Sequence, residues 1–141
     1  MAYKTKFVPE NKSKYIGNPE KIICRSLWER RVCEFLDKNV NVLKWSFETA
    51  KILYVNPHDQ KVHRYIPDFL VKMKKDGKII NYIWEVKPAK QTFLKENAKE
   101  SVKKLFEVNY AKWQAADEYC KKHGMRFEIL TERHIFHGER L

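Results

Sequence analysis

Two acidic residues and one lysine have types and spacing that could support metal chemistry. Asp68 follows a proline, and Glu85 and Lys87 stand two positions apart on either side of Val86. Two carboxylates a few ångströms apart repel each other, and a hard divalent cation with oxygen ligands relieves that repulsion. Such a cation can activate water and offset charge on a phosphate, and Lys87 could polarise that water. We therefore expect a magnesium or manganese site held by Asp68, Glu85 and the backbone carbonyl of Val86.

A β-hairpin would have to bring these residues together. Residues 63–73 and 79–87 are strand-like, and Asp76-Gly77 between them favours a tight hairpin turn. Eight residues separate Asp68 from Asp76, and eight separate Glu85 from Gly77. Alternate side chains of a strand point to the same face, so Glu85 and Lys87 should share one. The spacing predicts that Asp68 lies near Glu85.

The other elements predict a mixed α/β sheet flanked by helices. Residues 96–123 read as a long helix that ends at Gly124, with Val102, Leu105, Trp113 and Ala116 among its periodic apolar positions. A helix between two strands permits a parallel crossover, so the last strand should lie parallel to a hairpin strand. The remaining expected elements are a helix over 26–38 and strands over 42–48, 51–55 and 126–130.

Glu29 has two competing interpretations. It lies three residues after Ser26, which is the capping-box spacing at the start of the first predicted helix. It could equally add a carboxylate to the metal site, and the two roles compete for one side chain. We favour the site.

Composition limits the class of protein. The 141 residues fit one domain, 1–141, in which residues 1–20 read as an irregular basic arm. The formal net charge of +11 suits a polyanionic partner, DNA above all, and no basic amphipathic segment favours a membrane. No apolar run approaches the ~18 residues of a membrane span, and the start does not resemble a signal peptide, so we expect an intracellular setting. The three cysteines have no zinc-ligand spacing and are expected as free buried thiols.

Several segments carry a resemblance to known nucleases. Pro67-Asp68 followed by Glu85-Val86-Lys87 resembles the signature of the PD-(D/E)xK nuclease superfamily. Residues 25–29 resemble the acidic first-helix motif of many members, and residues 127–132 resemble the final strand of TnsA-type transposon endonucleases. Nearly the whole chain is similar to the small head completion nucleases of tailed phages, notably at residues 15–19, 24–26 and 63–65.

The resemblance implies more than the residues do by themselves. It implies a restriction-endonuclease-like fold and a magnesium-dependent phosphodiesterase that acts on double-stranded DNA. Asp68 and Glu85 would be metal ligands, Lys87 the catalytic lysine and Glu29 a supporting acid. It also implies work late in phage head assembly, after DNA packaging, with portal or head proteins as partners, in the host cytoplasm or the virion.

Three alternatives stay open at the level of sequence. A structural head protein could keep the fold and clamp DNA without cutting it, although two carboxylates near a phosphate would then gain nothing. A transposon-type end-cutting endonuclease with partner subunits is the second. A nuclease directed at RNA is the third, and the sequence does not distinguish endonuclease from exonuclease action.

Overall fold

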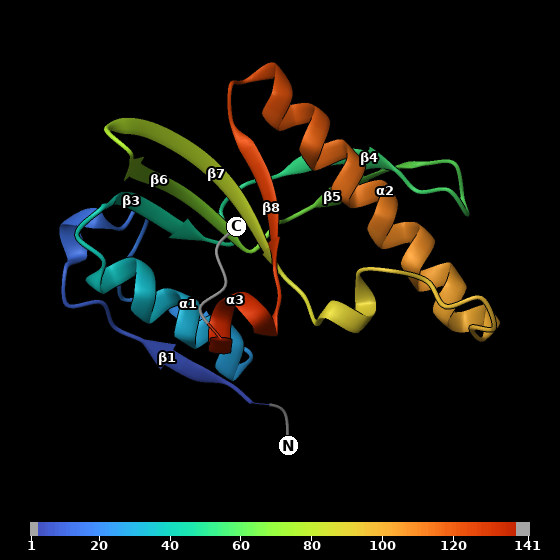
Figure 1. The fold of residues 1–141 in the computed structure, drawn as a ribbon, viewed down its shortest axis with the longest axis horizontal. Helices are drawn as coiled ribbons and strands as arrows, with labels where there is room; N and C mark the ends of the chain where they lie inside the picture. Colours follow the sequence, from blue (N-terminus) through green and yellow to red (C-terminus); the bar gives the residue numbers. More distant parts are fainter. Residues whose placement is uncertain (1–2, 138–141) are drawn as a thin grey trace.

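The fold is built on a four-stranded mixed sheet (Figure 1), seen in a computed structural model that describes residues 3–137. The strand order is β3-β6-β7-β8. Neighbours β3, β6 and β7 are antiparallel, whereas β8 runs parallel to β7. The mixed α/β architecture and the parallel last strand are therefore confirmed. The bounds are β3 (Val42–Phe47), β6 (Phe69–Lys75), β7 (Lys78–Val86) and β8 (Arg126–Leu130).

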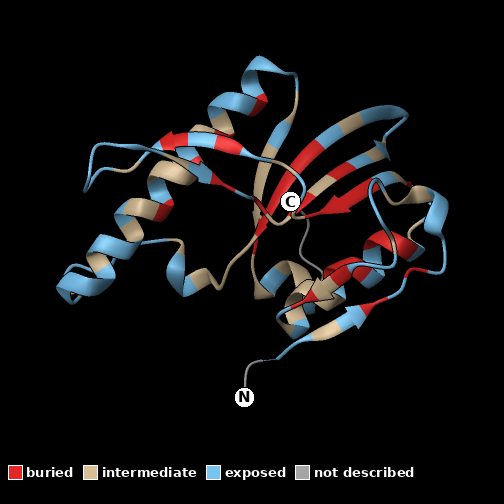
Figure 2. Cartoon of the chain, turned by 180° about the vertical axis from the view of Figure 1, so that it is seen from behind, coloured by how far each residue is buried: buried red, intermediate tan, exposed pale blue. Residues whose placement is uncertain are grey.

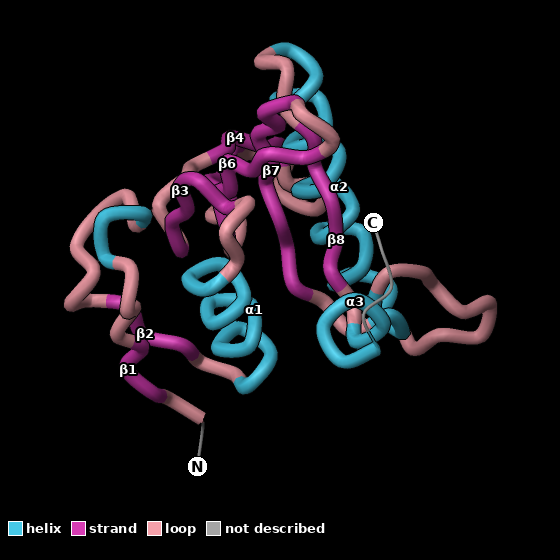
Figure 3. The backbone as a smooth tube through the Cα atoms, turned by 60° about the vertical axis from the view of Figure 1, so that its left-hand side comes forward, coloured by secondary structure: helices cyan, strands magenta, loops and turns pink. Residues whose placement is uncertain are grey.

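Two helices cover opposite faces of this sheet (Figure 3). Helix α1 (Leu27–Lys38) packs Val32, Cys33 and Leu36 into a core that includes Trp45 and the aromatic side chains of β7. Helix α2 (Glu100–Lys122) packs Trp113, Ala116 and Cys120 against the other face, around Ile83. Figure 2 shows the buried positions gathered on the central strands between the helices. All three cysteines are free and buried, as expected.

The hairpin turn sets the register on which the predicted site depends. Asp76 and Gly77 both have positive φ, 52° and 78°, as a two-residue turn that follows the strand twist requires. The pairs run from Lys75↔Lys78 at the turn to Phe69↔Trp84. One further step along this register places Asp68 opposite Glu85, so the predicted proximity is confirmed.

The strand predicted over 63–73 is in fact two strands in different sheets. Strand β5 (Val62–Tyr65) pairs with β4 (Ile52–Val55) in a separate two-stranded sheet that packs beneath α2. Strand β6 begins only at Phe69, after a break that contains the buried Pro67. Proline has no N–H to donate to a ladder, so it interrupts the pairing. Asp68 consequently lies just before β6 rather than within a strand.

The N-terminal segment is more ordered than the irregular arm predicted for residues 1–20. Within its described part, β1 (Thr5–Phe7) pairs with β2 (Ile22–Cys24), and a 3₁₀ turn, η1, spans Lys12–Lys14. Phe7 and Pro9 are buried, and the buried carboxylate of Asp37 accepts hydrogen bonds from the two backbone amides that follow Pro9. The two apolar side chains and these hydrogen bonds attach the segment to α1. The prediction of an irregular arm was therefore wrong for these residues.

Helix α2 begins at Glu100, later than the predicted start at residue 96, and its first turns are less buried than its apolar periodicity predicts. Val102 and Leu105 are exposed, because the N-terminal end of α2 extends beyond the sheet (Figure 1). The helix ends as expected before Gly124, which has a φ of 66°. A 3₁₀ turn η2 (Ala89–Gln91) precedes α2, and a short helix α3 (Glu132–His137) follows β8. Of the described helices, none combines the length and the apolar character needed to span a membrane.

Candidate active site

Asp68 and Glu85 meet where the β6–β7 hairpin ends. The backbone N–H of Val86 donates to Oδ2 of Asp68 at 2.7 Å, which holds that carboxylate against the end of β7. Asp68 is half-buried and Glu85 is buried. Within the described part of the chain, Oδ1 of Asp68 accepts no hydrogen bond, so it is free to act as a ligand.

The Glu85 carboxylate is oriented by a tyrosine and a lysine. The Tyr65 hydroxyl donates to Oε1 of Glu85 at 2.6 Å, from the end of β5. The Lys87 Nζ lies 3.6 Å from Oε2 of the same carboxylate. Lys87 follows the last residue of β7, and its backbone N–H donates to Leu130 in β8. The structure therefore brings Asp68, Glu85 and Lys87 together, and it adds Tyr65 to them.

Burial makes this pair of acids hard to ionise. Removal from water raises the pKa of Asp68 above its ordinary value, and repulsion from Glu85 raises it further. Burial also raises the pKa of Glu85, against which the Tyr65 hydrogen bond and the positive charge of Lys87 act. Acids whose charges are disfavoured by burial and by each other are typical of functional sites. A bound cation would offset both effects.

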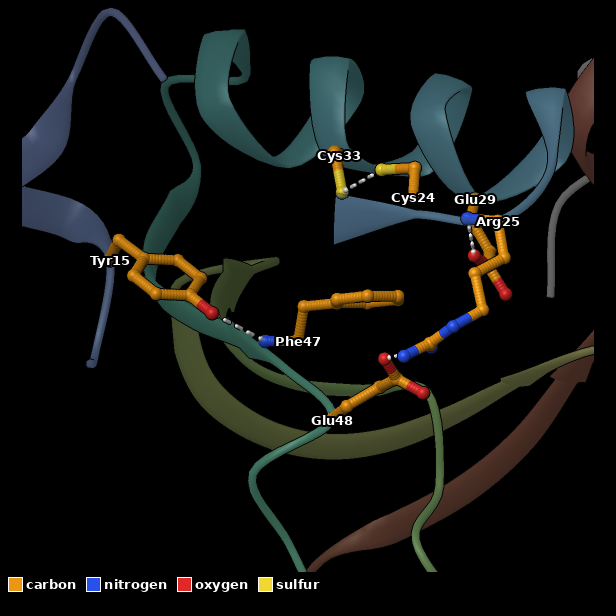
Figure 4. Close-up of polar contacts among 7 residues, drawn as sticks. All are labelled: Tyr15, Cys24, Arg25, Glu29, Cys33, Phe47 and Glu48. Atoms are coloured by element: carbon orange, nitrogen blue, oxygen red, sulfur yellow. Dashed lines mark hydrogen bonds and ion pairs between the residues drawn. The ribbon is translucent and has the colours of Figure 1, made fainter. Parts of the chain in front are cut away.

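The backbone and the side chain of Glu29 have different partners, which bears on its two interpretations. Its backbone N–H donates to the Ser26 hydroxyl at 3.1 Å, so Ser26 caps α1. Its carboxylate does not return to the Ser26 amide, as a complete capping box would require. Instead Oε1 accepts the backbone N–H of Arg25 at 2.7 Å (Figure 4). Burial raises the pKa of Glu29, and Lys87 is among the charges that lower it. The Glu29 carboxylate is therefore within electrostatic reach of Asp68 and Lys87.

Two polar residues of this region escaped the sequence analysis. Tyr65 reads as an ordinary strand aromatic, and its hydroxyl partner is 20 residues away. Glu48 follows β3, and its Oε1 forms an ion pair with the Arg25 guanidinium, which donates a hydrogen bond to it at 2.6 Å (Figure 4). Glu48 has a positive φ of 56°, which is uncommon for a residue with a side chain. Nothing in the residue type of Glu48 indicates that conformation.

The donor set fits a small hard cation that retains water ligands. Among residues 3–137, no group of three or more His, Cys, Asp and Glu side chains is arranged to hold a metal ion. Magnesium commonly takes only one or two protein carboxylates and completes its shell with water and substrate phosphate. Asp68 and Glu85, with the adjacent carbonyl of Val86, meet that requirement.

Comparison with known proteins gives two agreeing results. Residues 39–132 match the family model described as the N-terminal part of TnsA-like endonucleases. The head completion nuclease of Enterobacteria phage T4 is 39% identical over 142 residues, which cover 94% of this chain and 93% of that protein. The chain belongs to the TnsA-like endonucleases and is a head completion nuclease homologue. This membership confirms the family recognised from the sequence, the restriction-endonuclease-like fold and a nuclease of phage head completion.

The family match also bears on the candidate residues. The segment that matches the family model begins after Glu29 and includes Asp68, Glu85 and Lys87. The hairpin with its three polar residues thus lies inside the matched segment. Glu29 on α1 and Arg25, in the turn before that helix, lie outside it.

Proposed function

We propose that this nuclease hydrolyses phosphodiester bonds of double-stranded DNA with a divalent cation held by Asp68, Glu85 and the Val86 carbonyl. The observation that carries the proposal is the meeting of two buried or half-buried carboxylates with Lys87 at the open end of one hairpin. A site that served only to clamp DNA would be weakened by these carboxylates, because they repel phosphate. The geometry supports hydrolysis over a purely structural role for that reason.

Each residue has a distinct task in this proposal. A magnesium or manganese ion, when bound, supplies a Lewis acid that lowers the pKa of water and offsets charge at the phosphate. Asp68 is held for that task by the Val86 amide, and Glu85 is held by Tyr65. Lys87 donates towards the attacking water or a phosphate oxygen, and Glu29 adds a supporting negative charge near Asp68.

The biological setting follows from the relative. The T4 protein is a head completion nuclease, so we propose that this chain works at the same stage, in the host cytoplasm and the virion. Portal or head proteins are the proposed partners, and residues 1–141 are proposed to act as one nuclease domain. The net charge of +11 supports DNA as the ligand, since each neutralised phosphate releases counterions.

Cleavage of plasmid and linear DNA tests the proposal. Wild type, Asp68→Ala and Lys87→Ala are compared in magnesium, in manganese and in chelator, with circular dichroism as the check on folding. We expect metal-dependent cutting by wild type and losses of roughly a hundredfold or more in both variants. Lys12→Ala is the matched control, because Lys12 forms an exposed 2.7 Å ion pair with Glu20 outside the centre. Wild type that binds DNA but cuts it in neither metal would contradict the proposal and favour the clamp.

A further inference from the structure

Arg25 joins the acidic side chains of two separate elements. Its backbone N–H donates to Glu29 on α1, while its guanidinium donates to Glu48 after β3, at 2.7 and 2.6 Å respectively (Figure 4). Glu48 is in turn hydrogen-bonded through its backbone N–H to the carbonyl of Asp68, and the Asp68 charge also acts on the guanidinium. Arg25 is therefore a neighbour of the proposed centre, although nothing in the proposed chemistry uses it.

Glu48 lies beside the proposed centre and has an uncommon backbone conformation. Its N–H donates to the carbonyl of Asp68 at 2.8 Å, and its φ of 56° lies in the left-handed region. Strained non-glycine residues persist where the surrounding structure holds them, and they cluster at functional sites. The hydrogen bond to Asp68 and the ion pair to Arg25 are the contacts that hold Glu48 there.

The charged side chains around the proposed centre include more carboxylates than positive groups. Four carboxylates, those of Glu29, Glu48, Asp68 and Glu85, lie near three positive side chains, Arg25, Lys87 and Lys112. The carboxylates therefore outnumber the positive side chains before a divalent ion binds. A DNA phosphate that enters then brings further negative charge into the same space, and Lys87 is already engaged by Glu85.

Arg25 is suited to meet that phosphate. Its side chain is 62% exposed and that of Glu48 is 31% exposed, so the ion pair between them contributes little to stability and exchanges readily. The guanidinium stays charged and matches phosphate oxygens with two parallel hydrogen bonds. DNA offers it a row of phosphates, and so a higher density of negative charge than the single half-buried carboxylate of Glu48.

We propose that Arg25 is a phosphate-binding residue of this nuclease. When DNA binds, the Arg25 guanidinium exchanges its ion pair with Glu48 for a contact with a backbone phosphate. Glu48 is then a positioning residue that aims the guanidinium at the centre before DNA arrives. This inference rests on the proposed function only in taking DNA as the substrate.

A double-variant cycle separates this role from a structural one. Binding of a short DNA duplex is measured against salt concentration in magnesium, in a Lys87→Ala background that prevents cutting. Four proteins are compared: Arg25 and Glu48 intact, Arg25→Ala, Glu48→Gln and the double variant. We expect Arg25→Ala to weaken binding roughly tenfold even when Glu48 is already Gln. It should also reduce the slope of log affinity against log salt by about 1.

A purely structural ion pair predicts the opposite pattern. If Arg25 only neutralises Glu48, the double variant binds DNA as well as Glu48→Gln and keeps its salt slope, and the inference is overturned. Arg25→Lys keeps the charge and should retain most of the salt slope. Lys12→Ala, which removes one positive charge elsewhere, controls for net charge.

Cleavage with Lys87 restored distinguishes the two proposals. Arg25→Ala should raise the KM for DNA with much less effect on kcat, because a phosphate contact acts on bound substrate and transition state alike. Wild type that cuts while Arg25→Ala cuts equally well overturns this inference and leaves the proposed function intact. The expected binding pattern without any cutting supports the inference and contradicts hydrolysis. Wild type that neither binds nor cuts DNA overturns both.

Discussion

The backbone amide of Val86 donates to the carboxylate of Asp68 at 2.7 Å, so the end of one strand fixes the acid that precedes its partner strand. The link joins residues 18 positions apart across the hairpin. Among residues 3–137, the second carboxylate oxygen of Asp68 accepts no hydrogen bond. Asp68, the proposed metal ligand, thus also has a raised pKa and marks the end of the hairpin.

Replacement of Asp68 by Asn should inactivate the enzyme and yet stabilise the metal-free fold. Burial and Glu85 raise the pKa of Asp68, so the folded state holds a proton that the unfolded state releases. Wild type therefore loses stability as pH rises from near 4, the ordinary value for Asp, through the raised folded value. In chelator at pH 8, Asp68→Asn should melt a few degrees higher, since about 1 kcal/mol moves Tm by roughly 3–5 °C.

That advantage of Asp68→Asn should disappear towards pH 4, where wild-type Asp68 is protonated in both states. Saturating magnesium should restore or reverse the order, because only wild type binds it well. Scanning calorimetry across pH, with and without chelator, measures both trends. A lower Tm for the Asn variant in chelator at pH 8 would show that the Asp68 charge is not disfavoured.

Loss of the Tyr65 hydroxyl should weaken metal binding without disturbing the fold. Tyr65→Phe removes the 2.6 Å hydrogen bond that orients Glu85 and lowers its pKa. Removal of such an outer contact typically costs 10–100-fold in metal affinity or activity. Activity titrated against magnesium should shift to higher concentration. Tyr54→Phe, a buried tyrosine of the paired strand β4, is the matched control and should leave the titration unchanged.

The left-handed conformation of Glu48 predicts an unusual order of stability. Glu48→Gly and Glu48→Ala both remove the carboxylate, but only glycine adopts a φ of 56° without a steric penalty. The glycine variant should therefore be more stable than the alanine variant by about 1 kcal/mol. Urea denaturation of the pair measures the difference. Equal stability, or a more stable alanine variant, would contradict backbone strain at this position.

Attachment of the N-terminal segment to α1 should depend on Asp37. Its buried carboxylate accepts the amides of Glu10 and Asn11 at 2.8 and 2.9 Å. Asp37→Ala leaves these donors without their partner, at a cost of about 2–4 kcal/mol in urea denaturation. Glu34→Ala on the same helix, which removes only an exposed partner of Arg30, should change stability by less than about 0.5 kcal/mol. Similar effects of the two substitutions would argue against a structural role for the segment.

Local signals predicted much of the fold correctly. The Asp76-Gly77 turn and the alternation along β7 determined which residues face each other, because turn type fixes hairpin register. Ser26 and Gly124 marked helix ends through capping chemistry that acts within a few residues. The predictions failed where distant packing intervened. Pro67 separates two strands that read as one, and Phe7 and Pro9 order a segment that looked irregular.

The proximity of Asp68, Glu85 and Lys87 was determined by the sequence itself, since a two-residue turn and a period of two leave no other register for the hairpin. Only the tertiary structure decided that Tyr65, Arg25 and Glu48 join them. Their contacts span 20 and 23 residues and link β5, the turn before α1 and the end of β3. Such contacts depend on how helices and a second sheet pack against the first, and no local pattern encodes that packing.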